Sequence, residues 1–84
     1  MRPDTTDPEA PAPGDRIVVR GGQFASQRGT LVRRNGTNTS VVLHPASQTA
    51  VQTRDGRWWA VPTAQMLELT RVYPAAQYVT KDTE

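Results

Sequence analysis

Cysteine is absent from the 84 residues of this chain, and only one histidine and one lysine occur. Without cysteine there is no disulfide, no thiolate metal site and no cysteine nucleophile. The single histidine, His44, has no second histidine or thiolate with which to share a metal ion. It lies before Pro45 at the end of an apolar run, where a solvated or hydrogen-bonded side chain is typical. We therefore expect no metal and no other cofactor.

Long apolar runs are also missing. No stretch approaches the roughly 20 residues that a membrane-spanning helix needs. The N-terminal region lacks the continuous apolar segment of a signal peptide. From this we expect a cytoplasmic protein without a membrane partner.

The composition divides the chain into three parts. Residues 1–13 contain four prolines and a net acidic charge, which predicts a disordered tail. Residues 14–73 carry nearly all the large apolar side chains and predict one domain. Residues 74–84 predict a loosely ordered C-terminal tail, from which Tyr78 and Val79 can dock on the domain.

The apolar residues recur at the spacing of β-strands. Short β-branched runs are bounded by glycine, and Asn35-Gly36 and Asp55-Gly56 are strong hairpin signals. Residues 62–66 predict one turn of 3-10 helix before a last strand at residues 67–72. We expect an all-β domain of five to six short antiparallel strands closed into a small barrel, because closure removes exposed edges. The predicted core consists of Ile17, Val19, Phe24, Leu31, Val41, Leu43, Trp59, Val61, Met66, Leu67 and Leu69.

Positive charge is concentrated in the domain. Residues 14–73 contain eight arginines against three acidic residues, which is a net charge of +5, whereas both flanking segments are acidic. Arginines around the two predicted hairpins are candidates for phosphate contacts. On a strand, Trp58 and Trp59 point to opposite faces, and we expect Trp59 inside and Trp58 outside, where its ring can stack on a base. The candidate binding residues are Arg20, Arg28, Arg33, Arg34, Arg54, Arg57 and Trp58.

The segment at residues 14–34, GDRIVVRGGQFASQRGTLVRR, resembles the KOW motif of ribosomal proteins and of NusG/Spt5-type elongation factors. Gly14-Asp15, the alternating Ile17 and Val19, and the loop aromatic Phe24 stand at the positions of that pattern, as do Gly22, Gly29 and Leu31. Ser26 and Arg34 depart from it, because the family has a glycine and an apolar residue there. The resemblance implies a single SH3-like barrel and a non-catalytic role in transcription or translation.

Two functions remain open on these residues. The leading one is a module that binds RNA or single-stranded DNA, since no helix is predicted that would enter a major groove. The alternative is an adaptor, such as a phage or plasmid factor, that docks on an acidic protein surface of a polymerase, a ribosome or another large assembly, with Trp58 as its hot spot.

We expect the protein not to be an enzyme. Three carboxylates and several hydroxyl groups are present in the predicted domain, but no base is placed to activate a nucleophile. Glycine-rich phosphate-binding loops are absent as well.

Overall fold

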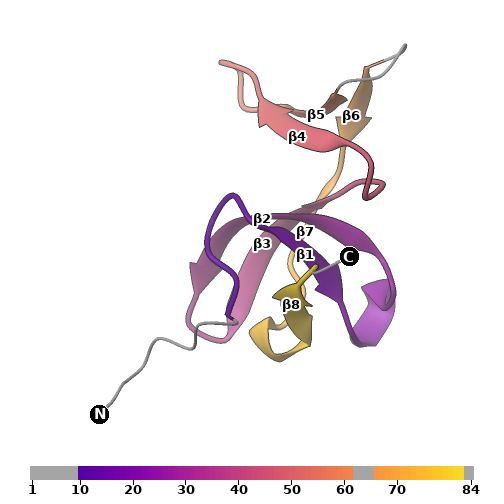
Figure 1. Cartoon of the computed structure of the whole chain (residues 1–84). Coiled ribbons are helices and arrows are strands. Elements are labelled where there is room, and N and C mark those ends of the chain that lie inside the picture. The colour runs from indigo at the N-terminus through magenta and orange to yellow at the C-terminus, as the bar shows by residue number, and fades with distance from the viewer. Residues whose placement is uncertain (1–9, 62–65, 83–84) are drawn as a thin grey trace.

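The computed structural model describes residues 10–61 and 66–82. Within these ranges, eight strands and two short 3-10 turns form the regular secondary structure (Figure 1). In chain order they are β1 (Arg16–Val19), η1 (Gly22–Phe24), β2 (Arg28–Asn35), β3 (Asn38–Leu43), β4 (Thr49–Gln52), β5 (Trp58–Val61), β6 (Leu67–Leu69), β7 (Arg71–Val72), η2 (Ala76–Tyr78) and β8 (Val79–Lys81).

The strands form two antiparallel sheets. The large sheet has the order β7-β3-β2-β1-β8, and the small sheet has the order β4-β5-β6. Figure 1 shows the small sheet above the large one, where the chain enters it after β3 and leaves it before β7. The prediction of a small antiparallel all-β domain is confirmed. There are more strands than expected for two reasons: residues 67–72 form two strands, β6 and β7, which lie in different sheets on either side of Thr70, and residues 79–81 form the additional strand β8.

One apolar core is enclosed by the large sheet. All five of its strands contribute to a cluster of buried aliphatic side chains, including Val72 from the edge strand β7 and Val79 from the opposite edge strand β8. Since side chains from both edges reach the same core, the sheet must curl around it. The cluster consists of Ile17, Val19, Leu31, Val41, Val72 and Val79, with Phe24, Leu43 and Tyr78 packed against it.

The predicted core is correct for the large sheet and wrong for part of the small one. Met66 and Leu67 are 54% and 52% exposed. Trp59, Val61 and Leu69 are only half-buried. Alternation of apolar residues indicates a strand, but it does not show whether a second layer covers that strand. A chain of this size fills one core, and the small sheet lies outside it.

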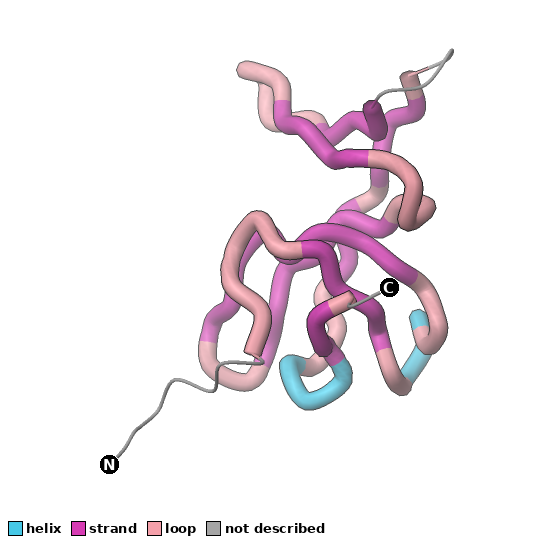
Figure 2. Tube along the Cα trace, in the orientation of Figure 1, coloured by secondary structure: helices cyan, strands magenta, loops and turns pink. Residues whose placement is uncertain are grey.

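Within residues 74–82 of the C-terminal segment, Tyr78 and Val79 dock on the domain, as the sequence allowed, and β8 joins the large sheet. Ile17 of β1 pairs with Lys81, and Val19 pairs with Val79. The ring of Tyr78 packs so closely on the loop before η1 that a Cβ added at Gly21 would lie 2.7 Å from it. Figure 2 shows η1 and η2 at the end of the large sheet away from the small sheet. The strand β8 has only three residues. It is held by its hydrogen-bonded pairing with β1 and by the burial of Val79 in the core.

Two further predictions concern residues outside the described ranges. The predicted disordered tail at residues 1–13 falls there except for residues 10–13. The 3-10 turn expected at residues 62–66 also falls there except for Met66, whereas the turn that precedes the last described strand is η2. Ser26, which replaces a glycine of the KOW pattern, has a φ of 73°, a left-handed conformation in which glycine is favoured.

The strands β2 and β3 approach so closely at Gly29 that no side chain fits. A Cβ built there would lie 2.2 Å from the carbonyl oxygen of Val42. We therefore expect Gly29→Ala to lower the free energy of unfolding by about 3 kcal/mol or more, because the backbone of β3 must move. Gly36→Ala is the control, since its Cβ meets no atom and only its φ of 62° is strained, which costs about 1 kcal/mol. Equal losses in urea unfolding would contradict this account of Gly29.

Val79 tests whether β8 belongs to the core. Val79→Ala removes two buried methyl groups, so we expect a loss of about 2 kcal/mol of unfolding free energy. Val51→Ala makes the same change on the exposed strand β4 and should cost less than about 0.5 kcal/mol. Thermal unfolding followed by circular dichroism measures both. A Val79 variant as stable as the Val51 variant would show that β8 is dispensable.

Candidate functional site

A bulge in β2 places a charged side chain on the face of the large sheet that points away from the core. Leu31 pairs with Val41, but the next pair is Arg33 with Ser40, because the register shifts between Leu31 and Arg33. In a regular strand, residues two apart share a face. The extra residue reverses this, so Leu31 is buried in the core while Arg33 lies on the opposite face beside Ser40.

The edge strand β7 brings further polar groups to the same face. Val72 points into the core and pairs with Val41, while Arg71 pairs with Val42. Tyr73 follows on the side of Arg71 and is 65% exposed. Because β7 and β2 lie on either side of β3, side chains far apart in sequence meet over the middle strand.

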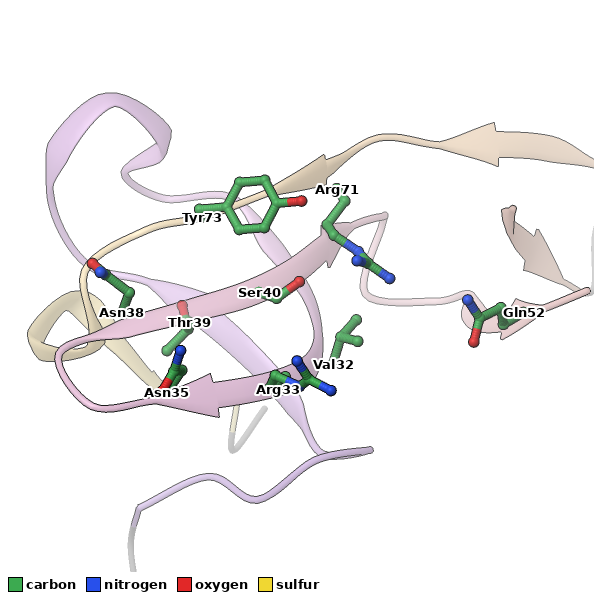
Figure 3. A pocket seen from close by; sticks show the side chains of 9 residues that line it. All are labelled: Val32, Arg33, Asn35, Asn38, Thr39, Ser40, Gln52, Arg71 and Tyr73. Carbon is green, nitrogen blue, oxygen red and sulfur yellow. The ribbon is translucent and has the colours of Figure 1, made fainter. Parts of the chain in front are cut away.

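Together these side chains form an open groove of about 500 Å³. Figure 3 shows the guanidinium groups of Arg33 and Arg71 extending toward the same side of the groove, where Gln52 of β4 lies. Among the described residues, neither guanidinium has an ion pair or a hydrogen bond. The groove is lined by Val32, Arg33, Asn35, Asn38, Thr39, Ser40, Gln52, Arg71 and Tyr73, so it contains two positive charges and no carboxylate.

Ser40 is an unsatisfied polar group in the floor of this groove. Its side chain is 8% exposed, and its hydroxyl has no hydrogen-bond partner within the described part of the chain. The neighbouring Thr39 is also buried, but its hydroxyl donates to the carbonyl of Pro74 over 2.8 Å. An unpartnered buried hydroxyl costs about 1–3 kcal/mol, and none of the described residues supplies a hydrogen bond to Ser40.

Three of the arginines predicted from the sequence are held by contacts within the protein. Arg28 forms a salt bridge of 3.4 Å with Asp82, whose side chain is 6% exposed. Arg57 lies 3.7 Å from both Asp55 and Glu68. Arg20 donates from Nε to the hydroxyl of Thr80 over 3.3 Å. These contacts connect the residue after β1, the start of β2 and the residue before β5 to neighbouring segments.

The two arginine-bearing hairpins do not converge. Figure 1 shows the tip of the β4–β5 hairpin well separated from the tip of the β2–β3 hairpin. Arg54 lies beside Asp55, Trp59 and Met66 on the small sheet, and none of these lines the groove around Arg33. Arg34 lies in a third hollow beside Gly36 and Thr37. Of the predicted site residues, only Arg33 therefore reaches the groove.

The predicted orientation of the two tryptophans is wrong. Trp58 is on the same face of the small sheet as the fully buried Ala60, and its ring nitrogen is buried. Trp59 shares its face with the exposed Val51 and Glu68, and it lines a surface hollow with Met66. Both rings are half-buried. The alternation placed them on opposite faces correctly, but only the packing of the sheets shows which face is covered.

His44 is a buried structural residue. Its Nδ1 lies 2.7 Å from the carbonyl oxygen of Pro45, and its Nε2 lies 2.6 Å from the hydroxyl of Thr30. A carbonyl can only accept, so Nδ1 donates to Pro45, while Nε2 shares a hydrogen bond with the Thr30 hydroxyl. Both ring nitrogens are used, and in the described ranges no three histidine, cysteine or acidic residues are grouped as a metal site.

Arg71, Tyr73 and Ser40 were missed by sequence reasoning. The alternation of residues 71–73 does indicate that Arg71 and Tyr73 share a face. However, the sequence contains no signal that β7 pairs with β3, since β7 has only two residues. Nor does it mark the bulge that turns Arg33 toward them.

Comparison with known proteins adds no relative. No protein-family model, no curated protein and no solved structure matches this chain. In the described ranges, no helix has the length and apolar character needed to cross a membrane.

Asp55 gives a direct test of the β4–β5 hairpin. The hydroxyl of Thr53 donates to its carboxylate, and the backbone N–H of Arg57 and the nearby Arg57 charge add to this, so the pKa of Asp55 is held below its ordinary value of 3.8. A lowered pKa means that the charged form stabilises the turn above about pH 4 and that this stabilisation is lost as the pH falls through the lowered pKa.

We expect a carbon-13 NMR titration of the Asp55 carboxyl to show this low pKa and Thr53→Ala to raise it toward 3.8, because the largest contribution is then gone. Thr70→Ala, an exposed threonine in another segment, should leave the titration unchanged. A Thr53 variant with an unaltered Asp55 titration would contradict the assignment.

Proposed function

We propose that this protein is a non-catalytic module that binds single-stranded nucleic acid through the groove between β2, β3 and β7. The observation that carries the proposal is a pair of guanidinium groups, Arg33 and Arg71, that have no partner among the described residues and lie on one groove beside the exposed ring of Tyr73. Arginine matches phosphate oxygens with two parallel N–H donors. An exposed aromatic ring adds a surface on which a base stacks.

The secondary structure of the described chain favours single-stranded nucleic acid over duplex DNA as the ligand. Its helical segments are three residues long, so none of them fills a major groove. Stacking on Tyr73 also requires a base whose face is free, which a duplex does not offer. The KOW resemblance of residues 14–34 is consistent with RNA as the ligand and with a role in transcription or translation.

A binding role fits the chemistry of the groove better than catalysis does. Its lining contains no histidine and no carboxylate. The Ser40 hydroxyl therefore has no general base within the groove. The side chains present are suited to holding an anion and a planar group, which favours a binding role.

The first test is a fluorescence anisotropy titration of labelled single-stranded RNA, single-stranded DNA and duplex DNA. We expect Arg33→Gln and Arg71→Gln each to weaken single-strand binding about fivefold at low salt and to reduce the salt slope by about 0.7, as for one lost phosphate contact. We expect Tyr73→Ala to cost about 1–3 kcal/mol of binding free energy and Tyr73→Phe to cost little.

Arg54→Gln is the matched control, because it removes the same charge from an exposed position outside the groove. If Arg54→Gln weakens binding as much as Arg33→Gln, net charge alone is responsible and the groove is not the site. No binding of any single strand by the wild type at about 50 mM salt would refute the proposal.

The small sheet favours a second candidate, an adaptor for an acidic protein surface. Val51, Trp59 and Met66 share one face, and Val51 and Met66 are exposed. Arg54 adjoins them and can steer an acidic partner. In that case Met66→Ser, which leaves the groove intact, would abolish capture of a polymerase or ribosomal partner, whereas nucleic-acid binding would be weak in the wild type.

A further inference from the structure

The register of the large sheet places Ser40 in the centre of a row of three side chains. Arg33 on β2 is the direct partner of Ser40. The pairs Val41 with Val72 and Asn38 with Ala75 share one register, and this register puts Tyr73 across from Ser40 on the other side. Neighbouring strands are about 4.8 Å apart. The hydroxyl of Ser40 therefore lies between a guanidinium and an aromatic ring, with Arg71 diagonally adjacent.

The hydrogen-bond donors of Arg33, Ser40 and Arg71 all fit the same kind of ligand. Both guanidinium groups only donate hydrogen bonds, and the Ser40 hydroxyl has a free proton to donate. A cation would be repelled by the two positive charges, and a neutral acceptor would leave them uncompensated. An anion with several acceptor oxygens satisfies all three groups at once. Phosphate has this form, and hydrogen bonds between charged partners are the strong ones.

The groove is larger than one phosphate requires. Its volume of about 500 Å³ lies within the range of about 300–1,000 Å³ that is usual for small-molecule sites. The wall opposite Arg33 is formed by the exposed ring of Tyr73. A phosphate over Ser40 would thus carry its attached sugar and base along the groove toward that ring.

We propose that the groove is a single-nucleotide subsite, in which Arg33 and Arg71 grip one phosphate, the Ser40 hydroxyl donates a third hydrogen bond to it, and the attached base stacks on Tyr73. This assignment rests on the proposed function and specifies its ligand as one nucleotide unit of a single strand. The Ser40 hydroxyl is covered in the free protein. The side chains that cover it therefore have to move aside as the phosphate enters.

The Ser40→Ala variant separates this role from a structural one. Because the hydroxyl has no internal partner, its removal should leave thermal stability unchanged or raise it. Binding of a labelled single-stranded oligonucleotide should fall about tenfold, as expected for a lost hydrogen bond to a charged group. Ser47→Ala, an exposed serine between β3 and β4, is the matched control and should change neither quantity.

The outcomes distinguish this inference from the function on which it rests. If Arg33→Gln and Arg71→Gln weaken binding but Ser40→Ala does not, the subsite is wrong and the nucleic-acid-binding function stands. If the wild type binds no oligonucleotide, both fall. Binding lost together with stability in Ser40→Ala would show a structural role for Ser40 and would overturn the subsite.

A second measurement uses the unmodified protein. Adenosine monophosphate, adenosine and inorganic phosphate are titrated separately against the isotope-labelled chain and followed by NMR. We expect the monophosphate to shift the Arg33 and Ser40 amides and the Tyr73 ring, phosphate to shift only the first two, and adenosine to shift the ring weakly. Monophosphate-induced shifts that miss Ser40 or Tyr73 would overturn the proposal.

Discussion

Both the core and the groove depend on the way β2 pairs with β3 in the large sheet. Gly29 lets the two backbones approach until the position of its absent Cβ overlaps the carbonyl of Val42, and the bulge after Leu31 then reverses which face the strand presents. The same hairpin therefore supplies Leu31 to the core and Arg33 to the opposite face. A regular ladder would have placed both side chains on one face, and either the charge or the aliphatic group would have been in the wrong environment.

The curl of the large sheet follows from the small size of the chain. Six aliphatic side chains from five strands form the core, and they include one from each sheet edge. Since the core has so few members, the last short strand contributes to it directly, through Val79, while residues 79–81 pair with β1. The small sheet adds hydrogen-bonded strands without a core of its own, and apart from the fully buried Ala60 its apolar side chains stay half-buried or exposed.

The arginines differ in whether other residues of the protein bind their guanidinium groups. Arg28 and Arg57 are paired with carboxylates, and Arg16 is bonded to Ala46 and Thr49, so these side chains connect separate segments of the chain. Arg33 and Arg71 have no such partner among the described residues and lie over a buried, unsatisfied hydroxyl. The proposed binding groove therefore rests on the two guanidinium groups that are unpaired within the described part of the chain.

The sequence by itself determined the all-β class, both hairpins, the core positions of β1 to β3 and the excess of positive charge in the domain. These follow from local rules, namely glycine in turns and the two-residue period of strands. Only the tertiary structure decided that residues 67–72 divide between two sheets, that Trp58 lies on the covered face, and that Arg71 and Tyr73 join Arg33. Strand pairing and bulges arise from contacts between distant segments, and local periodicity is the same whichever strand becomes the neighbour.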